Sequence, residues 1–168
     1  KPELSYGVNW GGHTESYTDE RGEYRVRWVP QRQVKGMYFG TPIQGYGVNN
    51  CNTLALWSAR AIRSLALDAF NAGDYYRAME DQVQSETVTK VLYPNDEPEV
   101  GKQLRLLQQF FFVSCSLQDI LHLLRDFAQL PIQELPNRVA IQLNDTHPSI
   151  AVAEMMRLLI DEHALDWD

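Results

Sequence analysis

The first forty residues have the apolar enrichment and short runs typical of strands. Leu4 to Trp10, Tyr24 to Val29 and Val34 to Phe39 are rich in Tyr, Val and Trp, which favour extended structure. Residues 19–22 (Asp-Glu-Arg-Gly) place turn-forming side chains between two of these runs. We therefore expect residues 1–44 to be β-rich.

The pattern changes to helical spacing in the middle of the chain. Glycines at positions 40, 45 and 47 indicate a loop, and Leu54 to Ile62 is a short helix candidate. We expect residues 45–73 to form this loop and short helix. Asp74 can cap a second helix, expected over residues 74–92. Apolar side chains line one side of that helix: Tyr76, Met79, Val83 and Val91.

The rest of the chain is predicted to be mainly helical. Pro94 and Pro98 break the helical pattern, so residues 93–101 are expected to form a loop. A long helix should follow, from about Lys102 to Arg125. Its core-facing positions recur at helical spacing: Leu106, Phe110, Val113, Leu117, Ile120 and Leu124. After a linker at residues 130–136, we expect a strand and a last helix, all within a unit of residues 102–168.

The strand and helix near the end enclose the most informative polar cluster. An apolar run from Val139 to Leu143 stops at Asn144, Asp145 and His147, and helical spacing resumes at Ile150. This order predicts a buried strand, a polar turn and a helix, which defines an α/β fold class. Open α/β sheets bind ligands at the carboxyl ends of their strands, so the polar turn is a candidate site.

Composition and charge narrow the class of function. The 168 residues are 44% hydrophobic, with a mean hydropathy of -0.37, and are long enough for one folded domain. The formal net charge of -7, without a basic run, argues against nucleic acid or an anionic membrane as partner. No apolar run could span a bilayer. Two distant cysteines without metal-ligand spacing favour a reduced, cytoplasmic setting and no metal site.

Each candidate residue has a functional and a structural interpretation. Asp145 and His147 suit hydroxyl groups of a sugar, but either Asp145 or Thr146 could instead cap the next helix, with His147 at the surface. Spacing alone favours the second interpretation modestly. Asn95 and Asp96 could belong to a mobile acidic gate, although their composition favours a solvated connection between helices.

Arg105 likewise allows two interpretations. It could pair with Asp96 or with a ligand, or it could make a surface ion pair worth about 0–1 kcal/mol. The sequence contains no nucleophile elbow and no phosphate loop, because Gly45-Tyr-Gly47 lacks the necessary strand-turn-helix spacing. Both ends of the chain look cut, and one strand-turn-helix unit cannot form a parallel sheet by itself. We therefore expect a segment of a larger protein.

Several stretches together resemble one family, the α-glucan phosphorylases, which act on glycogen, starch or maltodextrin. The stretches occur in the family's order: GY (45–46), NTLALWSA (52–59), VLYPND (91–96), GKQLRL (101–106), LQDI (117–120) and IQLNDTHPS (141–149). The resemblance continues through residues 153–168, whereas the first forty residues match more loosely.

The resemblance implies part of the N-terminal Rossmann-like half of a GT-B two-domain glycosyltransferase fold. It also implies phosphorolysis of a terminal α-1,4-linked glucose by orthophosphate, giving glucose 1-phosphate. The family's cofactor is pyridoxal phosphate, whose phosphate group acts in proton transfer. The implied setting is a cytoplasmic homodimer that contacts an α-1,4-glucan and phosphate.

Five residues are implied to bind substrate. Asn95 and Asp96 resemble the family's mobile active-site loop, Arg105 its arginine at the cleft, and Asp145 and His147 residues lining the acceptor subsites. The resemblance assigns no catalytic, cofactor-binding or metal residue to this segment. Helix 74–92 resembles the family's tower helix, which packs against its twin in the dimer.

Some positions depart from the family pattern. Glu97 stands where the family often has an Asn that contacts glucose, and Ala55 replaces an arginine of the NTLRLW-like motif. His122 and Leu123 replace two arginines that hold AMP in animal enzymes, so we hypothesise that AMP does not activate the parent enzyme.

The cofactor's lysine belongs to a part of the family that this segment does not resemble. The lysines here are Lys1, Lys35, Lys90 and Lys102, and none lies in that motif. We therefore predict that the isolated segment is inactive. The alternative is a non-catalytic glucan-binding or dimerisation module. The sequence leaves open which glucan is preferred and whether Glu97 contacts glucose.

Overall fold

Five strands are followed along the chain by the helices in the computed structural model, which describes residues 4–63 and 65–167. Residues 1–3 of the predicted β-rich segment therefore lie outside the described residues. The strands are β1 (Ser5–Trp10), β2 (His13–Thr18), β3 (Tyr24–Val29), β4 (Arg32–Gln44) and β5 (Cys51–Ala61). The α-helices are α1 (Leu67–Asn71), α2 (Tyr75–Lys90), α3 (Glu99–His122), α4 (Leu135–Arg138) and α5 (Ala151–Arg157). This mixture agrees with the predicted α/β class at the coarse level.

The strands form two antiparallel sheets in the described part of the chain. One has the order β1-β4-β5, with Val8 opposite Val34 and Tyr38 opposite Trp57. The other is the hairpin β2-β3, closed by the predicted turn at Asp19, whose side chain accepts hydrogen bonds from the backbone N–H groups of residues 21 and 23 at 2.9 Å. The three predicted strands are confirmed, and β2 is an additional strand.

The predicted short helix at Leu54 to Ile62 is wrong, because residues 51–61 form strand β5. The segment pairs along its whole length with β4, and Trp57 and Ala59 point inward at alternate positions, 7% and 0% exposed. Strand β4 also extends through residues 40–42, which the sequence predicted to belong to a loop. The loop is confined to residues 45–50.

The two central helices confirm the sequence prediction. The carboxylate of Asp74 accepts a hydrogen bond from the Arg77 backbone N–H at 3.1 Å, so Asp74 caps α2 as expected. Helix α3 begins after Pro98 and continues into a π-helical turn at Leu123–Phe127. Helix α5 likewise continues into a π-helical turn at Leu158–Glu162.

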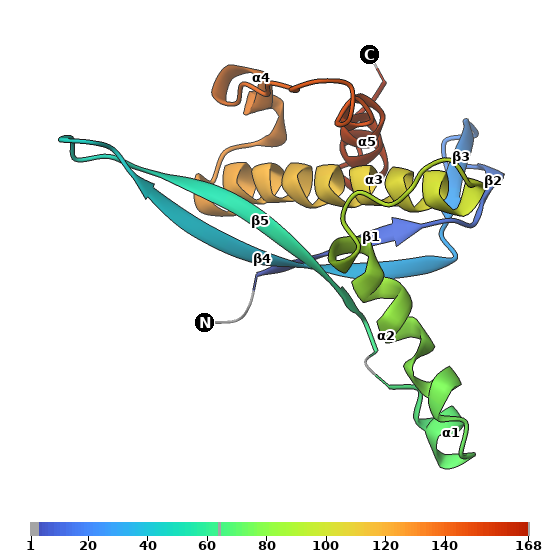
Figure 1. Ribbon diagram of the computed structural model, residues 1–168. Helices are drawn as coiled ribbons and strands as arrows, with labels where there is room; N and C mark the ends of the chain where they lie inside the picture. Colours follow the sequence, from blue (N-terminus) through green and yellow to red (C-terminus); the bar gives the residue numbers. More distant parts are fainter. Residues whose placement is uncertain (1–3, 64, 168) are drawn as a thin grey trace.

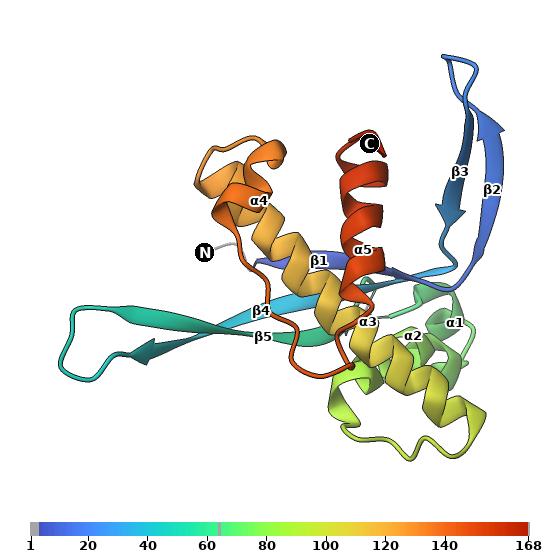
Figure 2. The same ribbon diagram turned by 90° about the horizontal axis from the view of Figure 1, so that it is seen from above.

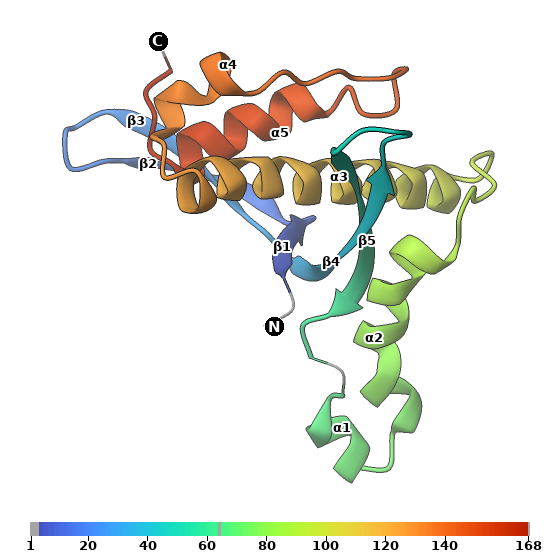
Figure 3. The same cartoon turned by 90° about the vertical axis from the view of Figure 1, so that its left-hand side faces the viewer.

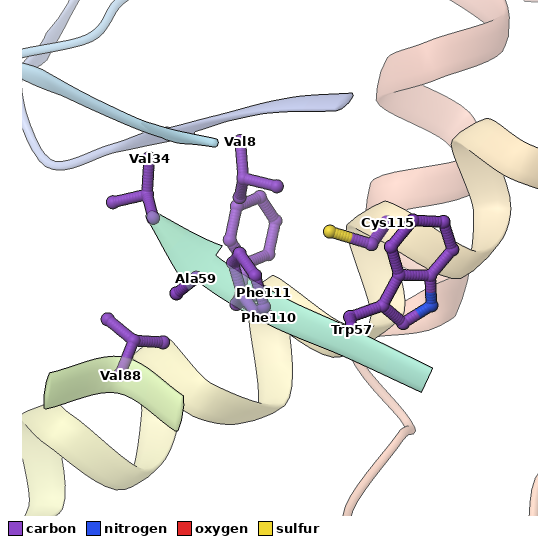
Figure 4. Packing of buried hydrophobic residues seen from close by; sticks show 8 residues of the cluster. All are labelled: Val8, Val34, Trp57, Ala59, Val88, Phe110, Phe111 and Cys115. Atoms are coloured by element: carbon purple, nitrogen blue, oxygen red, sulfur yellow. The ribbon is translucent and has the colours of Figure 1, made fainter. Parts of the chain in front are cut away.

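Helix α3 lies between the three-stranded sheet on one side and α5 on the other (Figures 1 and 2). The side chains between sheet and helix form the main core, shown in Figure 4. Phe111 and Cys115 of α3 are fully buried there. A Cβ atom at Gly36 of β4 would lie 2.3 Å from Cys115 Sγ, so the absence of a side chain at Gly36 allows helix and sheet to approach this closely.

A buried polar cluster joins α3 to α5. Glu154 is 2% exposed and accepts a hydrogen bond from Ser114 Oγ at 2.6 Å. Arg157 donates to both carboxylate oxygens of Glu154, at 2.7 and 3.0 Å. Because a buried charge is tolerated only when it is paired, this cluster fixes the position of α5 on α3.

The predicted buried strand at Val139 to Leu143 is wrong for the described structure. Val139 has extended backbone angles, but residues 139–144 pair with no strand among the described residues. Ile141 and Leu143 are 46% and 40% exposed. The segment runs back along α3 and then turns into α5 (Figures 2 and 3). The preceding linker contains a 3-10 turn (Ile132–Glu134) and α4.

None of the helices in residues 4–63 and 65–167 is long and apolar enough to cross a membrane.

Candidate functional site

A pocket of about 380 Å³ lies between α3, the loop that precedes it and the turn before α5. It brings Arg105 and His147 together, two of the five predicted site residues. The volume is in the range of ordinary small-molecule sites, roughly 300–1,000 Å³. The lining residues are Leu92, Tyr93, Pro94, Arg105, Gln108, Gln109, Phe112, Val113, His147 and Pro148.

The wall formed by the loop begins where α2 ends. The last helical hydrogen bond at this end runs from the Val91 backbone N–H to the Thr87 carbonyl oxygen at 3.2 Å. Tyr93 then adopts a left-handed backbone with φ of 52°, which few residues with a side chain do. Pro94 follows and cannot continue a helix. These two residues turn the chain away from α2 and place the Tyr93 side chain in the pocket wall.

Asn95 and Gly101 close the loop onto the first turn of α3. Asn95 Oδ1 accepts a hydrogen bond from the Glu97 backbone N–H at 3.1 Å, which forms a tight turn. A Cβ atom at Gly101 would lie 1.7 Å from the Asn95 carbonyl oxygen. The loop therefore depends on the absence of a side chain at Gly101.

Asp96 and Arg105 form an ion pair at one side of the pocket. Arg105 Nη1 lies 3.4 Å from Asp96 Oδ2, and the two side chains are 37% and 53% exposed. An exposed pair of this kind is worth only about 0–1 kcal/mol. Arg105 can therefore exchange the Asp96 carboxylate for another anion or for a hydroxyl oxygen at little cost.

His147, which lines the pocket, forms a second pair with Asp145, which does not. His147 Nε2 lies 3.2 Å from Asp145 Oδ2, while Asp145 Oδ1 accepts from the Thr146 backbone N–H at 2.6 Å. That backbone hydrogen bond, followed by the charge of His147, lowers the pKa of the Asp145 carboxyl group. The N-cap of α5 is Ile150, without a side-chain cap, so the interpretation of Asp145 or Thr146 as a helix cap is wrong.

Sequence reasoning missed Gln108, which lies one turn after Arg105 on α3. Its side-chain Nε2 donates to the carbonyl oxygens of Val88 and Val91, at 3.0 and 2.6 Å. Gln108 is 9% exposed and lines the pocket. Its place in a predicted long helix gave no signal of this, because a glutamine beside an apolar stripe is usually a surface residue.

Larger hollows lie elsewhere on the molecule, of about 570 Å³ beside α2 and about 820 Å³ beside the β2-β3 hairpin. Neither is lined by any of the five predicted residues. Within the described residues, no three His, Cys, Asp or Glu side chains are grouped as a metal site would require.

The pocket has apolar walls, one arginine and one histidine, which is the composition of a site for a polar small molecule. The chain matches the carbohydrate phosphorylase family over residues 1–168 and belongs to that family.

Its relatives are named as glycogen phosphorylases. It is 54% identical to glycogen phosphorylase of Synechocystis sp. over 168 residues, which cover 99% of this chain and 20% of the relative. It is 41% identical to glycogen phosphorylase 2 of Dictyostelium discoideum, in a match that covers 99% of this chain and 17% of that relative. It is also 41% identical to the muscle form of glycogen phosphorylase from Homo sapiens, in a match that covers 100% of this chain and 20% of that relative. The chain thus spans about a fifth of the length of these relatives.

Proposed function

We propose that the protein containing this chain is a glucan phosphorylase. It would cleave a terminal α-1,4-linked glucose with orthophosphate and release glucose 1-phosphate. The observation that carries the proposal is the match to the carbohydrate phosphorylase family over the whole chain, together with relatives named as glycogen phosphorylases. The meeting of Arg105 and His147 in one pocket supports it, because these side chains suit phosphate and sugar hydroxyl groups.

In this proposal the five predicted residues form the substrate site, some by direct contact and some by shaping it. Arg105 offers a cation at the pocket, and His147, held by Asp145, offers a ring nitrogen to a sugar hydroxyl. Asn95 shapes the loop at residues 93–98, which is three residues shorter than the predicted 93–101 because α3 begins at Glu99. Asp96 stays paired with Arg105 until a ligand takes its place. We further propose that the chain contributes to the N-terminal Rossmann-like half of a GT-B fold.

Pyridoxal phosphate, the cofactor implied by the family resemblance, does not fit the residues of this pocket. A Schiff base needs a lysine amine, and Lys35, Lys90 and Lys102 do not line the pocket. Lys90 and Lys102 instead pair with Glu86 and Glu99 on their own helices. We propose that another part of the protein holds the cofactor.

The proposed assembly is a cytoplasmic homodimer that uses α2. Tyr76 and Val83, 94% and 61% exposed, lie seven residues apart and share one face of that helix. The opposite face is buried at Ala78, Ser85 and Val88. An exposed apolar stripe on a helix that projects from the body (Figure 1) suits packing against a second copy.

The test uses the full-length protein, supplied with maltodextrin and orthophosphate, and measures release of glucose 1-phosphate. The wild-type protein should release it, while the 168-residue chain alone should not. Arg105→Ala should raise KM for orthophosphate or glucan by about 10- to 100-fold, the usual effect of losing a charged hydrogen bond.

The matched control is Lys102→Ala, which removes a cation from the same helix outside the pocket. It should leave both KM values unchanged. A wild-type protein that binds maltodextrin but releases no glucose 1-phosphate would favour the alternative, a non-catalytic glucan-binding or dimerisation module.

A further inference from the structure

The side-chain amide of Gln108 has a fixed orientation. Its nitrogen, Nε2, donates to the carbonyl oxygens of Val88 and Val91. Val88 lies in the last turn of α2, and Val91 is the residue that ends this helix. A flipped amide would place its own oxygen against both carbonyl oxygens, where no hydrogen atom could bridge them. Both N–H groups of the amide are thus used, and its oxygen, Oε1, must point away from α2.

Oε1 keeps contact with solvent. Among the described residues, every buried side-chain nitrogen or oxygen has a hydrogen-bond partner. The hydrogen bonds of Gln108 within that part of the chain involve Nε2 and leave Oε1 without a donor. Oε1 therefore belongs to the accessible surface of Gln108, and the hollow that Gln108 lines is the pocket shared with Arg105 and His147.

We propose that Gln108 Oε1 is a fixed acceptor for a sugar hydroxyl group in this pocket, and that it helps to determine which ligand binds there. The inference rests on the proposed glucan function. It differs from the roles given to Arg105 and His147, because an amide oxygen accepts hydrogen bonds and does not donate them. A fully ionised anion offers no hydrogen to this oxygen, whereas a sugar hydroxyl does.

The surroundings of Oε1 suit a sugar ring. Phe112, one helical turn after Gln108 on α3, and Leu92 both line the pocket, so it has apolar walls beside its polar groups. A hexose has apolar C–H faces and hydroxyl groups at its edge, and both find partners here. Because the two α2 carbonyl groups already hold the amide in place, the acceptor loses little conformational entropy when a ligand binds.

The experiment measures binding of maltopentaose to the full-length protein by calorimetry. The probes are maltopentaose and a set of analogues that each lack one hydroxyl group. At least one analogue should bind the wild-type protein about 5- to 10-fold more weakly, the usual effect of losing one neutral hydrogen bond. Gln108→Met removes the acceptor and keeps the volume. This variant should bind maltopentaose more weakly by a similar factor, and it should bind that analogue with no further loss of affinity.

Gln108→Glu separates the pocket role from a purely structural one. A carboxyl group keeps an acceptor oxygen in either protonation state and gives up at least one of the two N–H donors to α2, so maltopentaose affinity should be kept while thermal stability falls. Gln103→Met, an exposed glutamine on the same helix, should change neither quantity.

Two results would overturn the inference. One is equal loss of maltopentaose affinity in Gln108→Met and Gln108→Glu. The other is that all analogues bind the wild-type protein as well as maltopentaose does, a measurement that needs no variant to fold. If the wild-type protein binds maltopentaose but releases no glucose 1-phosphate, the proposed activity fails and the inference about Gln108 still stands or falls on the analogues.

Discussion

Gly101 leaves no room for a side chain next to the loop before α3, so this loop should be sensitive to a single added methyl group. A Cβ atom there would meet the Asn95 carbonyl oxygen at 1.7 Å and the Asp96 Cα at 3.2 Å. Backbone atoms cannot rotate away, so Gly101→Ala should displace the loop and cost about 1–3 kcal/mol locally. Amide hydrogen exchange of residues 95–101 in the full-length protein should become about 10-fold faster or more.

The control for this substitution is Val100→Ala at the neighbouring position. Val100 is 77% exposed, so its truncation should change loop exchange by less than about 0.5 kcal/mol. Equal exchange rates in Gly101→Ala and the wild-type protein would show that the loop is not held by this contact.

The two cysteines should differ strongly in reactivity because their surroundings differ. Burial, and after it the negative charge of Asp119, raises the pKa of the Cys115 thiol to about 12. A raised pKa means less thiolate at a given pH, so Cys115 should stay neutral at pH 8. Cys51 is exposed. Iodoacetamide at pH 8 should therefore label Cys51 in the folded protein and Cys115 only after denaturation, as mass spectrometry of the peptides would measure. Equal labelling of both in the folded state would contradict the packing of α3 on the sheet.

The residues of the candidate site were proposed from the family resemblance, because their spacing alone left structural interpretations open. Arg105 and His147 were both singled out, and they share one pocket although 42 positions separate them along the chain. Their use in binding stays a prediction. Gln108 could not be found in this way, because its orientation depends on two backbone carbonyl groups at the end of another helix. Every residue has a carbonyl group, so the sequence does not show which ones a side chain will contact.

At the scale of elements, tertiary pairing overrode local preference in β5. Leu, Ala and Arg at residues 54–60 favour a helix by intrinsic propensity. In the structure this segment pairs with β4 over eleven residues and buries Trp57 and Ala59 against α3. Strand β2 escaped prediction for the opposite reason, because its sequence HTESYT has little apolar alternation and is held by pairing with β3.

Helix α2 gives a test at the same scale, because its start depends on one side chain. Asp74→Ala removes the acceptor for the Arg77 backbone N–H and should destabilise the first turn of α2 by about 1 kcal/mol. Native-state hydrogen exchange of residues 75–79 should reveal the change. Asp74→Asn keeps an acceptor oxygen and should exchange like the wild-type protein. Equal protection in Asp74→Ala would mean that packing of α2 on β5 alone fixes the start of the helix.

At the scale of the whole molecule, the sequence could not show which strands pair with the segment before α5. Val139 to Leu143 has the apolar pattern of a buried strand, yet Ile141 and Leu143 are 40% exposed or more and no described strand lies beside them. A strand needs a neighbour to satisfy its backbone N–H and C=O groups. The pattern therefore agrees with the proposed Rossmann-like half, in which further strands of the protein would pair with this segment.

The proposed dimer is the last property of the whole molecule, and α2 makes it testable. Tyr76 and Val83 are exposed on the face opposite the buried positions of the helix, so acidic substitutions there should not disturb the fold. Tyr76→Asp with Val83→Asp would place two charges in the proposed interface. Sedimentation of the full-length protein should then show a dissociation constant raised about 30-fold or more. Tyr76→Phe keeps the apolar ring and should remain dimeric. A monomeric wild-type protein, or a dimer insensitive to both charges, would remove α2 from the assembly and leave its exposed stripe without a partner.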